Sequence, residues 1–140
     1  MKRLLFVSLL VAIGFVSRAQ IASGSCKLPG TYDYVNVDYY EDGHLTVSNQ
    51  SGMKITQLHI KVTYVLTASR PEIPGDVPIV GTFTPVNQNY YDIEPNKTTE
   101  IWDGVNKAGP KYERKTSNSG ETVILTRHSF VVEVGNLMCR

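Results

Sequence analysis

The histidines and cysteines are the side chains whose spacing could create a chemical site in this chain. The three histidines, His44, His59 and His128, stand apart, and no His-x-His, Cys-x-x-Cys or His-Glu-x-x-His spacing would assemble a zinc site from one segment. There is also no Gly-x-Ser-x-Gly elbow and no glycine-rich phosphate loop. The sequence therefore predicts a protein without catalytic residues, metal or cofactor. An enzyme is the third-ranked alternative, because its groups would have to converge in the fold.

Two further polar patterns have ordinary structural explanations. Four carboxylates near one another could offer oxygens to calcium, namely Asp33, Asp38, Glu41 and Asp42. Their spacing matches no calcium-binding loop, so a solvated acidic edge is the favoured interpretation. The segments Asn49-Gln50-Ser51 and Asn96-Lys97-Thr98 are glycan acceptor sequons, but the same residues are common in turns.

Aromatic side chains are the remaining candidates for a binding role. The chain has eight tyrosines and four phenylalanines, and several tyrosines are adjacent in sequence. Strand alternation predicts that one set points outward, where rings beside Asn and Asp could stack on sugars or anchor a protein partner: Tyr34, Tyr40, Tyr90 and Trp102. The alternative, which we favour, is that tyrosine suits half-buried strands and packs against neighbouring strands.

Cys26 and Cys139 are the two cysteines, and they lie near opposite ends of the chain. In an oxidising compartment an even number of cysteines predicts a disulfide, here one that would join the two ends of the domain. A loop of this length would contribute roughly 4 to 5 kcal/mol on the chain-entropy model. Two unpaired thiols are the alternative, because spacing alone does not bring the residues within bonding range.

The first nineteen residues are typical of an export signal. Met1-Lys2-Arg3 precedes an apolar run, Leu4 to Val16, and Ser17-Arg18-Ala19 supplies small residues at the exit. The run is shorter than the roughly 20 apolar residues that cross a bilayer, so cleavage after Ala19 is expected, with no transmembrane segment in the mature chain. The sequence thus predicts a secreted or periplasmic protein.

Removal of this signal changes the charge that a partner would meet. Without its three basic residues, 11 basic residues face 13 acidic ones, and the formal charge moves from +1 to −2. Nucleic acid is therefore not an expected partner, because it demands concentrated positive charge. The one basic cluster, Lys107, Lys111, Arg114 and Lys115, is interpreted as a solvated segment rather than an anion site.

The rest of the chain has the pattern of an all-β domain. Short segments rich in Val, Ile, Thr and Tyr alternate with period two and are separated by turn residues. The expected strands are 32–40, 45–47, 55–66, 79–84, 90–93, 98–102, 111–116, 122–127 and 129–134. The phase of the apolar residues changes at His128-Ser129, which predicts a β-bulge.

The longest of these segments predicts a central strand. Leu58, Ile60 and Val62 fall on one face of Ile55 to Leu66, and polar residues fall on the other. Such burial is worth roughly 1.5 to 3 kcal/mol for each large side chain. The three prolines in Arg70 to Pro78 remove backbone donors, so that segment is expected to be an exposed connection or an edge.

Together these features predict one domain over residues 20–140, an immunoglobulin-like β-sandwich of about seven to nine antiparallel strands. A small β-barrel with a similar number of strands is the alternative.

Two parts of the chain resemble secreted bacterial immunoglobulin-like modules of the FxLYD type. Gly43 to Ser51 followed by Ile55 to Tyr64 resembles the strand ending in Asn-x-Ser and the long alternating strand that follows it, and Tyr91 to Thr98 resembles a later turn. Asn96 stands where that pattern has glycine, and the motif that names the family is absent. The resemblance covers about half of the mature chain, and it implies an extracytoplasmic accessory or interaction domain with no catalytic residues.

Two functions of different classes follow. The preferred one is an exported, non-enzymatic protein-interaction or cell-envelope accessory module that presents a sheet face, loop or edge to an unknown protein. The alternative is a carbohydrate-binding module that uses the Tyr and Trp face on a cell-surface glycan.

Overall fold

The structure, a computed structural model, describes residues 19–102, 108 and 111–140. The predicted signal peptide, residues 1–19, lies outside this range except for Ala19, and so does Lys107 of the basic cluster. The described residues form eight strands: β1 (Gln20–Lys27), β2 (Tyr34–Tyr40), β3 (Leu45–Asn49), β4 (Ile55–Ser69), β5 (Ile79–Ile93), β6 (Lys97–Ile101), β7 (Tyr112–Thr116) and β8 (Thr122–Cys139).

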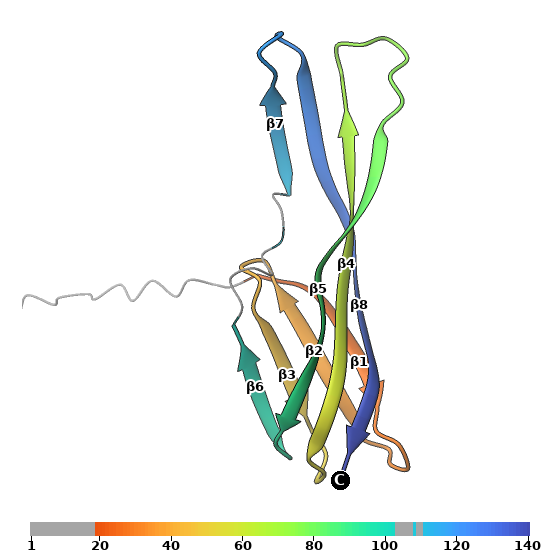
Figure 1. Ribbon diagram of the computed structural model, residues 1–140, viewed down its shortest axis with the longest axis vertical. Helices are drawn as coiled ribbons and strands as arrows, with labels where there is room; N and C mark the ends of the chain where they lie inside the picture. Colours follow the sequence, from red (N-terminus) through yellow and green to blue (C-terminus); the bar gives the residue numbers. More distant parts are fainter. Residues whose placement is uncertain (1–18, 103–107, 109–110) are drawn as a thin grey trace, which may run out of the picture.

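The strands build two antiparallel sheets of four strands each (Figure 1). The first, sheet A, has the order β1-β2-β3-β6, and the second, sheet B, has the order β5-β4-β8-β7. Each sheet therefore brings together strands that are distant in sequence. The expected all-β fold of packed antiparallel strands is confirmed, and β4 occupies a central position between β5 and β8 as its alternation predicted.

Period-two alternation explains how the two sheets meet. Val35 and Val37 of β2 and Leu58, Ile60 and Val62 of β4 are fully buried, and the residues between them in sequence are more exposed. Each strand thus turns one apolar face toward the other sheet and one polar face outward. The core between the sheets follows directly from this pattern.

Two pairs of expected strands are in fact single, long strands. β5 runs without interruption through residues 79–93, because its ladder with β4 continues past the register shift near Pro85. An edge strand tolerates proline, since its outward N–H has no partner to lose. β8 likewise continues through residues 122–139, and the predicted bulge is confirmed by a register shift and by the positive φ of 41° at Ser129.

β1 was not expected from the sequence, because its inward residues are small. Ala22 and Gly24 pair with buried residues of β2, and Gly24 lies against β8 of the opposite sheet. A Cβ atom on Gly24 would stand 2.4 Å from the carbonyl oxygen of Val132. β1 therefore approaches β8 closely because this position has no side chain.

Part of sheet B extends well beyond sheet A (Figure 1). We call this extension the arm; it consists of β7 with the paired portions 66–69 of β4, 79–83 of β5 and 122–127 of β8. Alternate side chains of β4 are buried as far as Tyr64, and every side chain from Val65 onward is half-buried. The arm is therefore a four-stranded sheet that the first sheet does not cover.

Candidate binding surfaces

The outer face of sheet A is lined by small polar side chains. Register places Asn36 opposite Ser48, Asp38 opposite Thr46, and Ser48 opposite Thr98. These residues alternate with the buried apolar residues of the same strands, so they share the solvent side of the sheet. The face offers hydroxyl, amide and carboxylate groups to a ligand.

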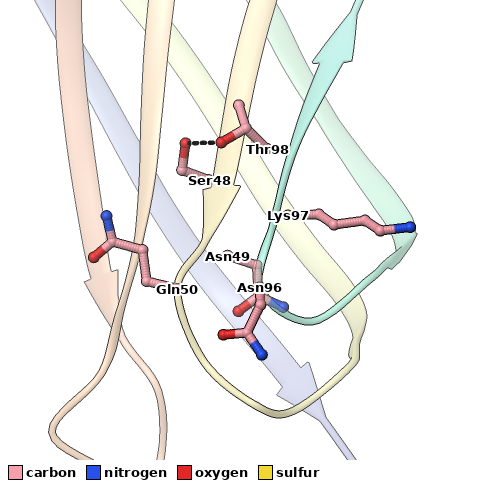
Figure 2. Close-up of a pocket in the computed structure, with 6 residues that line it drawn as sticks. All are labelled: Ser48, Asn49, Gln50, Asn96, Lys97 and Thr98. Atoms are coloured by element: carbon pink, nitrogen blue, oxygen red, sulfur yellow. Dashed lines mark hydrogen bonds between the residues drawn. The ribbon is translucent and has the colours of Figure 1, made fainter.

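A shallow polar depression of about 300 Å³ lies at one end of this face (Figure 2). It is lined by Ser48, Asn49, Gln50, Asn96, Lys97 and Thr98. The hydroxyl groups of Ser48 and Thr98 are 2.8 Å apart, which ties β3 to β6. A second depression of about 450 Å³ shares Ser48 and Gln50 and continues toward β1. The two depressions together form a polar groove across sheet A.

Asn49 stabilises the floor of this groove rather than offering a free amide. Its Nδ2 donates to the carbonyl oxygens of Met53 at 2.8 Å and Glu94 at 3.1 Å, and its Oδ1 accepts hydrogen bonds from the backbone and hydroxyl of Ser51. The residue is buried, so its sequon cannot take a glycan in the folded protein. Asn96 of the other sequon is exposed in a turn with φ of 52°.

Three of the four predicted outward aromatics lie on the polar face of sheet A. Tyr34 is 47% exposed and Trp102 is 59% exposed, whereas Tyr40 is half-buried. Tyr34 and Tyr40 stand at opposite ends of β2, about 20 Å apart at the usual rise of a strand. The three rings therefore flank the polar groove and do not form one platform.

The expected outward position of Tyr90 is wrong. Tyr90 pairs with the buried Leu58 and packs against the core, and the neighbouring Tyr91 is exposed instead. Tyr90 and the buried Ile93 both face the core although they are three residues apart, because the strand is irregular between them, where Asp92 has a positive φ of 57°.

His44 is a buried residue of this region that the sequence patterns did not single out. Its ring stacks on Tyr40 with centroids 4.1 Å apart and lies 5.9 Å from the ring of Trp102. Its Nδ1 forms a short contact with the carboxylate of Asp42, and its Nε2 lies 3.8 Å from Glu100. The only signal in the sequence is the turn Asp42-Gly43-His44, where an Asp side chain commonly binds the backbone two residues later.

The arm is the second candidate surface, because apolar side chains remain exposed on it. Val80 is 65% exposed and Ile79 is 70% exposed in β5, and Phe83 is 46% exposed near the base. Val80 and Ile79 project from opposite faces of the sheet, since they are consecutive in a strand. Neither face of the arm is covered by another strand among the described residues.

Aromatic packing and an ion pair fix the base of the arm to the sandwich. Tyr64 stacks with Phe83 at 5.6 Å between ring centroids and packs against Phe130 at 5.1 Å. The buried guanidinium of Arg127 lies over the ring of Phe130, and its Nη2 is 2.9 Å from Oε1 of Glu41. The core thus continues into the base of the arm and holds its direction.

The connection at the tip of the arm is closed by one carboxylate. Asp76 accepts hydrogen bonds from the backbone N–H of Arg70 at 2.8 Å and from its guanidinium at 2.6 and 2.9 Å. These contacts, the backbone one first, hold the pKa of Asp76 below its ordinary value. The segment Arg70 to Pro78 is an exposed connection, as its prolines predicted.

Cys26 and Cys139 are both half-buried free thiols in the structure. Cys26 pairs with Val35 in sheet A, and Cys139 pairs with Ile55 in sheet B. Both partners are buried, so the two cysteines face the interior from opposite sheets. Their pairing in an oxidising compartment remains a prediction.

The acidic residues considered for calcium do not gather at one point. Asp38 binds Gln20 and Thr46, Glu41 pairs with Arg127, and Asp42 contacts His44. Within the described ranges, no three His, Cys, Asp or Glu residues are grouped so as to hold a metal ion. The same residues include no helix long and apolar enough to cross a membrane.

The segments that resemble FxLYD modules fall on neighbouring elements of the fold. Gly43 to Ser51 covers β3, Ile55 to Tyr64 covers the first part of β4, and Tyr91 to Thr98 contains the turn from β5 to β6. The likeness of strand pattern therefore concerns strands of both sheets, and family membership remains a prediction. No protein-family model, curated protein or solved structure matches this chain.

Proposed function

We propose that this protein is exported and acts as a non-enzymatic interaction module whose binding element is the arm. The observation that carries the proposal is the four-stranded arm itself, which leaves Ile79, Val80 and Phe83 exposed beyond the sandwich. Exposed apolar surface on a rigid support is typical of a site that another protein covers. The signal-like N-terminus supports export to the periplasm or the cell exterior.

The base of the arm supports a binding role because it holds the arm in one orientation before a partner binds. Two sets of contacts connect the arm to the core: the packed rings of Tyr64, Phe83 and Phe130, and the ion pair between Arg127 and Glu41. A surface held in place before binding loses less conformational entropy when a partner arrives. The arm can therefore present its side chains without first folding.

Comparison of two valine substitutions in the exported protein tests this proposal. Crosslinking followed by affinity capture from the exported fraction should recover a reproducible protein with the wild-type chain, and Val80→Glu should remove it. The matched control is Val131→Glu. Val131 is also a valine of sheet B and is 54% exposed, but it lies on the sandwich and not on the arm. Equal recovery by all three proteins, or no arm-dependent protein at all, would contradict the proposal.

Export has its own test. The mature protein recovered outside the cytoplasm should begin at Gln20, the residue after the predicted cleavage point. A protein that keeps Met1 and stays in the cytoplasm would refute this part of the proposal.

A second candidate function is carbohydrate binding by the outer face of sheet A. The observation that favours it is the polar groove between β1 and β6, together with the exposed rings of Tyr34 and Trp102 elsewhere on the same face of the sheet. Sugars combine hydroxyl groups with apolar ring faces, so such a surface has suitable chemistry. Binding on a glycan array should be lost in Trp102→Ala and retained in Tyr91→Ala, whose ring is exposed on sheet B. An array without any bound glycan would eliminate this function.

A further inference from the structure

The free edge of the arm differs in charge from the opposite edge of the same sheet. β5 is the outer strand of sheet B, and no residue from Val77 to Tyr91 carries a charge. The opposite outer strand, β7, contains Glu113, Arg114 and Lys115 in five residues. Charged side chains discourage pairing at an open strand edge, whereas an uncharged β-branched edge invites it. The β5 edge of the arm is therefore an open edge with no charged side chain to oppose pairing with another strand.

Two prolines limit the part of this edge that can pair. Pro78 precedes β5 and Pro85 lies within it, and neither has a backbone N–H to donate. Between them lies Ile79-Val80-Gly81-Thr82-Phe83-Thr84, a segment rich in β-branched and aromatic residues. The accepting edge is thus about six residues long, an ordinary length for a strand.

We infer that the strand accepted here is β5 of a second copy of this chain, paired antiparallel about a two-fold axis. The inference rests on the arm being the binding element, and it names the partner. The same segment then meets itself, as an isologous interface requires. It supplies an uncharged strand of matching length, so no charge is buried on either side.

The faces of the arm restrict this pairing to registers centred on a residue, and a pair centred on Gly81 uses most of the segment between the two prolines. Residues directly opposite each other in a sheet share a face, so Ile79, Gly81 and Phe83 must meet residues of that same set. Centring the pair on Gly81 brings Ile79 of one copy opposite Phe83 of the other, twice by symmetry. It also brings Val80 opposite Thr82 on the other face. Aromatic and β-branched cross-strand pairs are among the favourable ones.

The central glycine fits this register. A Cβ atom on Gly81 would contact the ring of Phe83 at 3.2 Å, so the glycine leaves room for that ring to lie along the strand. At the two-fold axis the two copies of Gly81 face each other without side chains between them. The rings of both Phe83 residues can then cover the centre of the joined sheet.

Two charge substitutions test both the pairing and its register. In sedimentation of the exported protein, the wild type should form a dimer that dissociates on dilution. Val80→Glu and Thr82→Lys should each weaken the dimer about tenfold, because each charge is placed twice across the axis. An equimolar mixture of the two variants should form heterodimers, since Glu at position 80 of one copy meets Lys at position 82 of the other.

Controls separate this inference from the proposed function. Val131→Glu adds the same charge on the sandwich and should leave the dimer unchanged. A wild type that stays monomeric at all concentrations, a dimer unaffected by either charge, or a mixture without heterodimers would overturn the inference. A monomer that still captures a foreign protein through Val80 would overturn only the identity of the partner. A monomer that captures nothing would also contradict the proposed function.

Discussion

Replacement of Gly24 by alanine should destabilise the protein at the contact between β1 and β8. The added Cβ would lie 2.4 Å from the carbonyl oxygen and 3.1 Å from the carbonyl carbon of Val132. Carbon and oxygen atoms not bonded to each other normally stay about 3.3 Å apart or more, so the strands must separate by nearly 1 Å. The carbonyl cannot turn away easily, because Val132 pairs with Val62 in the central ladder of sheet B.

The expected loss follows from overpacking and from the gap that opens beside it. Forcing an extra methyl into a packed interior costs roughly 1 to 3 kcal/mol, and separating β1 from β8 loosens Ala22 as well. We expect Gly24→Ala to lower the free energy of unfolding by about 2 to 3 kcal/mol. That is a large share of the roughly 5 to 15 kcal/mol that stabilises a typical domain.

Urea unfolding of the exported protein, followed by circular dichroism and by the fluorescence of the single tryptophan, measures this loss. Gly52→Ala is the matched control, because nothing lies within 4 Å of its added Cβ and its φ is not positive. The control should keep its stability within about 0.5 kcal/mol. Equal stability of Gly24→Ala and Gly52→Ala would refute the close approach of β1 and β8.

A second substitution identifies the atom responsible. Val132→Ala removes the Cγ1 atom that lies 3.0 Å from the added Cβ, but it leaves the carbonyl oxygen in place. The losses of Gly24→Ala and Val132→Ala should therefore add in the double variant. A double variant that regains stability would show that the side chain, and not the backbone, limits this contact.

Three further changes have defined outcomes. Asn49→Leu should lower the free energy of unfolding in urea by about 3 kcal/mol, because the buried carbonyls of Met53 and Glu94 lose their hydrogen-bond donor. Gln50→Leu on the exposed neighbour should cost little, and equal effects of the two substitutions would contradict this hydrogen-bond network. Burial first, with Tyr64 adding to it, raises the pKa of Tyr39 to about 12, so the neutral phenol stabilises the fold fully below pH 10 and loses this effect as the pH rises toward 12. In Tyr39→Phe that alkaline loss, about 2 to 3 kcal/mol, should disappear from unfolding curves, and an unchanged pH profile would refute the assignment. The lowered pKa of Asp76 means that its contacts act fully above about pH 4 and fade as the pH falls through the lowered value. Asp76→Asn should therefore admit protease at the tip of the arm at neutral pH, and protection equal to that of the wild type would argue against the closed connection.

The strands that could be predicted from sequence are those with one face exposed to solvent and the other buried in the core. In β4, Leu58, Ile60 and Val62 recur at every second position, because the sheet buries one side and exposes the other. The same rule fails for β1, whose inward residues Ala22 and Gly24 must be small beside β8. Apart from Ile21 near its start, β1 therefore has no large apolar residue from which alternation could be recognised.

The candidate surfaces could be predicted only in part. Alternation placed Tyr34 and Trp102 outward correctly, because β2 and β6 pair without register shifts. It misplaced Tyr90, because the positive φ of Asp92 breaks the alternation between Tyr90 and the buried Ile93. The arm could not be foreseen at all, since alternation reports which residues share a face but not whether another sheet covers that face.

The distribution of charge among the four sheet edges argues for a closed dimer rather than a growing fibre. β6 begins with Lys97 and carries Glu100, β7 is charged along its length, and β1 lies against β8 at Gly24. In the described part of the chain, the β5 segment between Pro78 and Pro85 is thus the uncharged edge rich in β-branched and aromatic residues, whereas β1, uncharged from Gln20 to Cys26, consists mostly of small residues. Pairing of two copies about a two-fold axis uses this segment in both copies. The two sheets then form one continuous sheet that ends in a charged β7 strand on both sides. Filaments would require a second free edge of the same kind, so substitution of Glu113, Arg114 and Lys115 by threonine should convert dimers into larger assemblies in sedimentation. Unchanged dimers in that variant would show that the charges on β7 do not limit assembly.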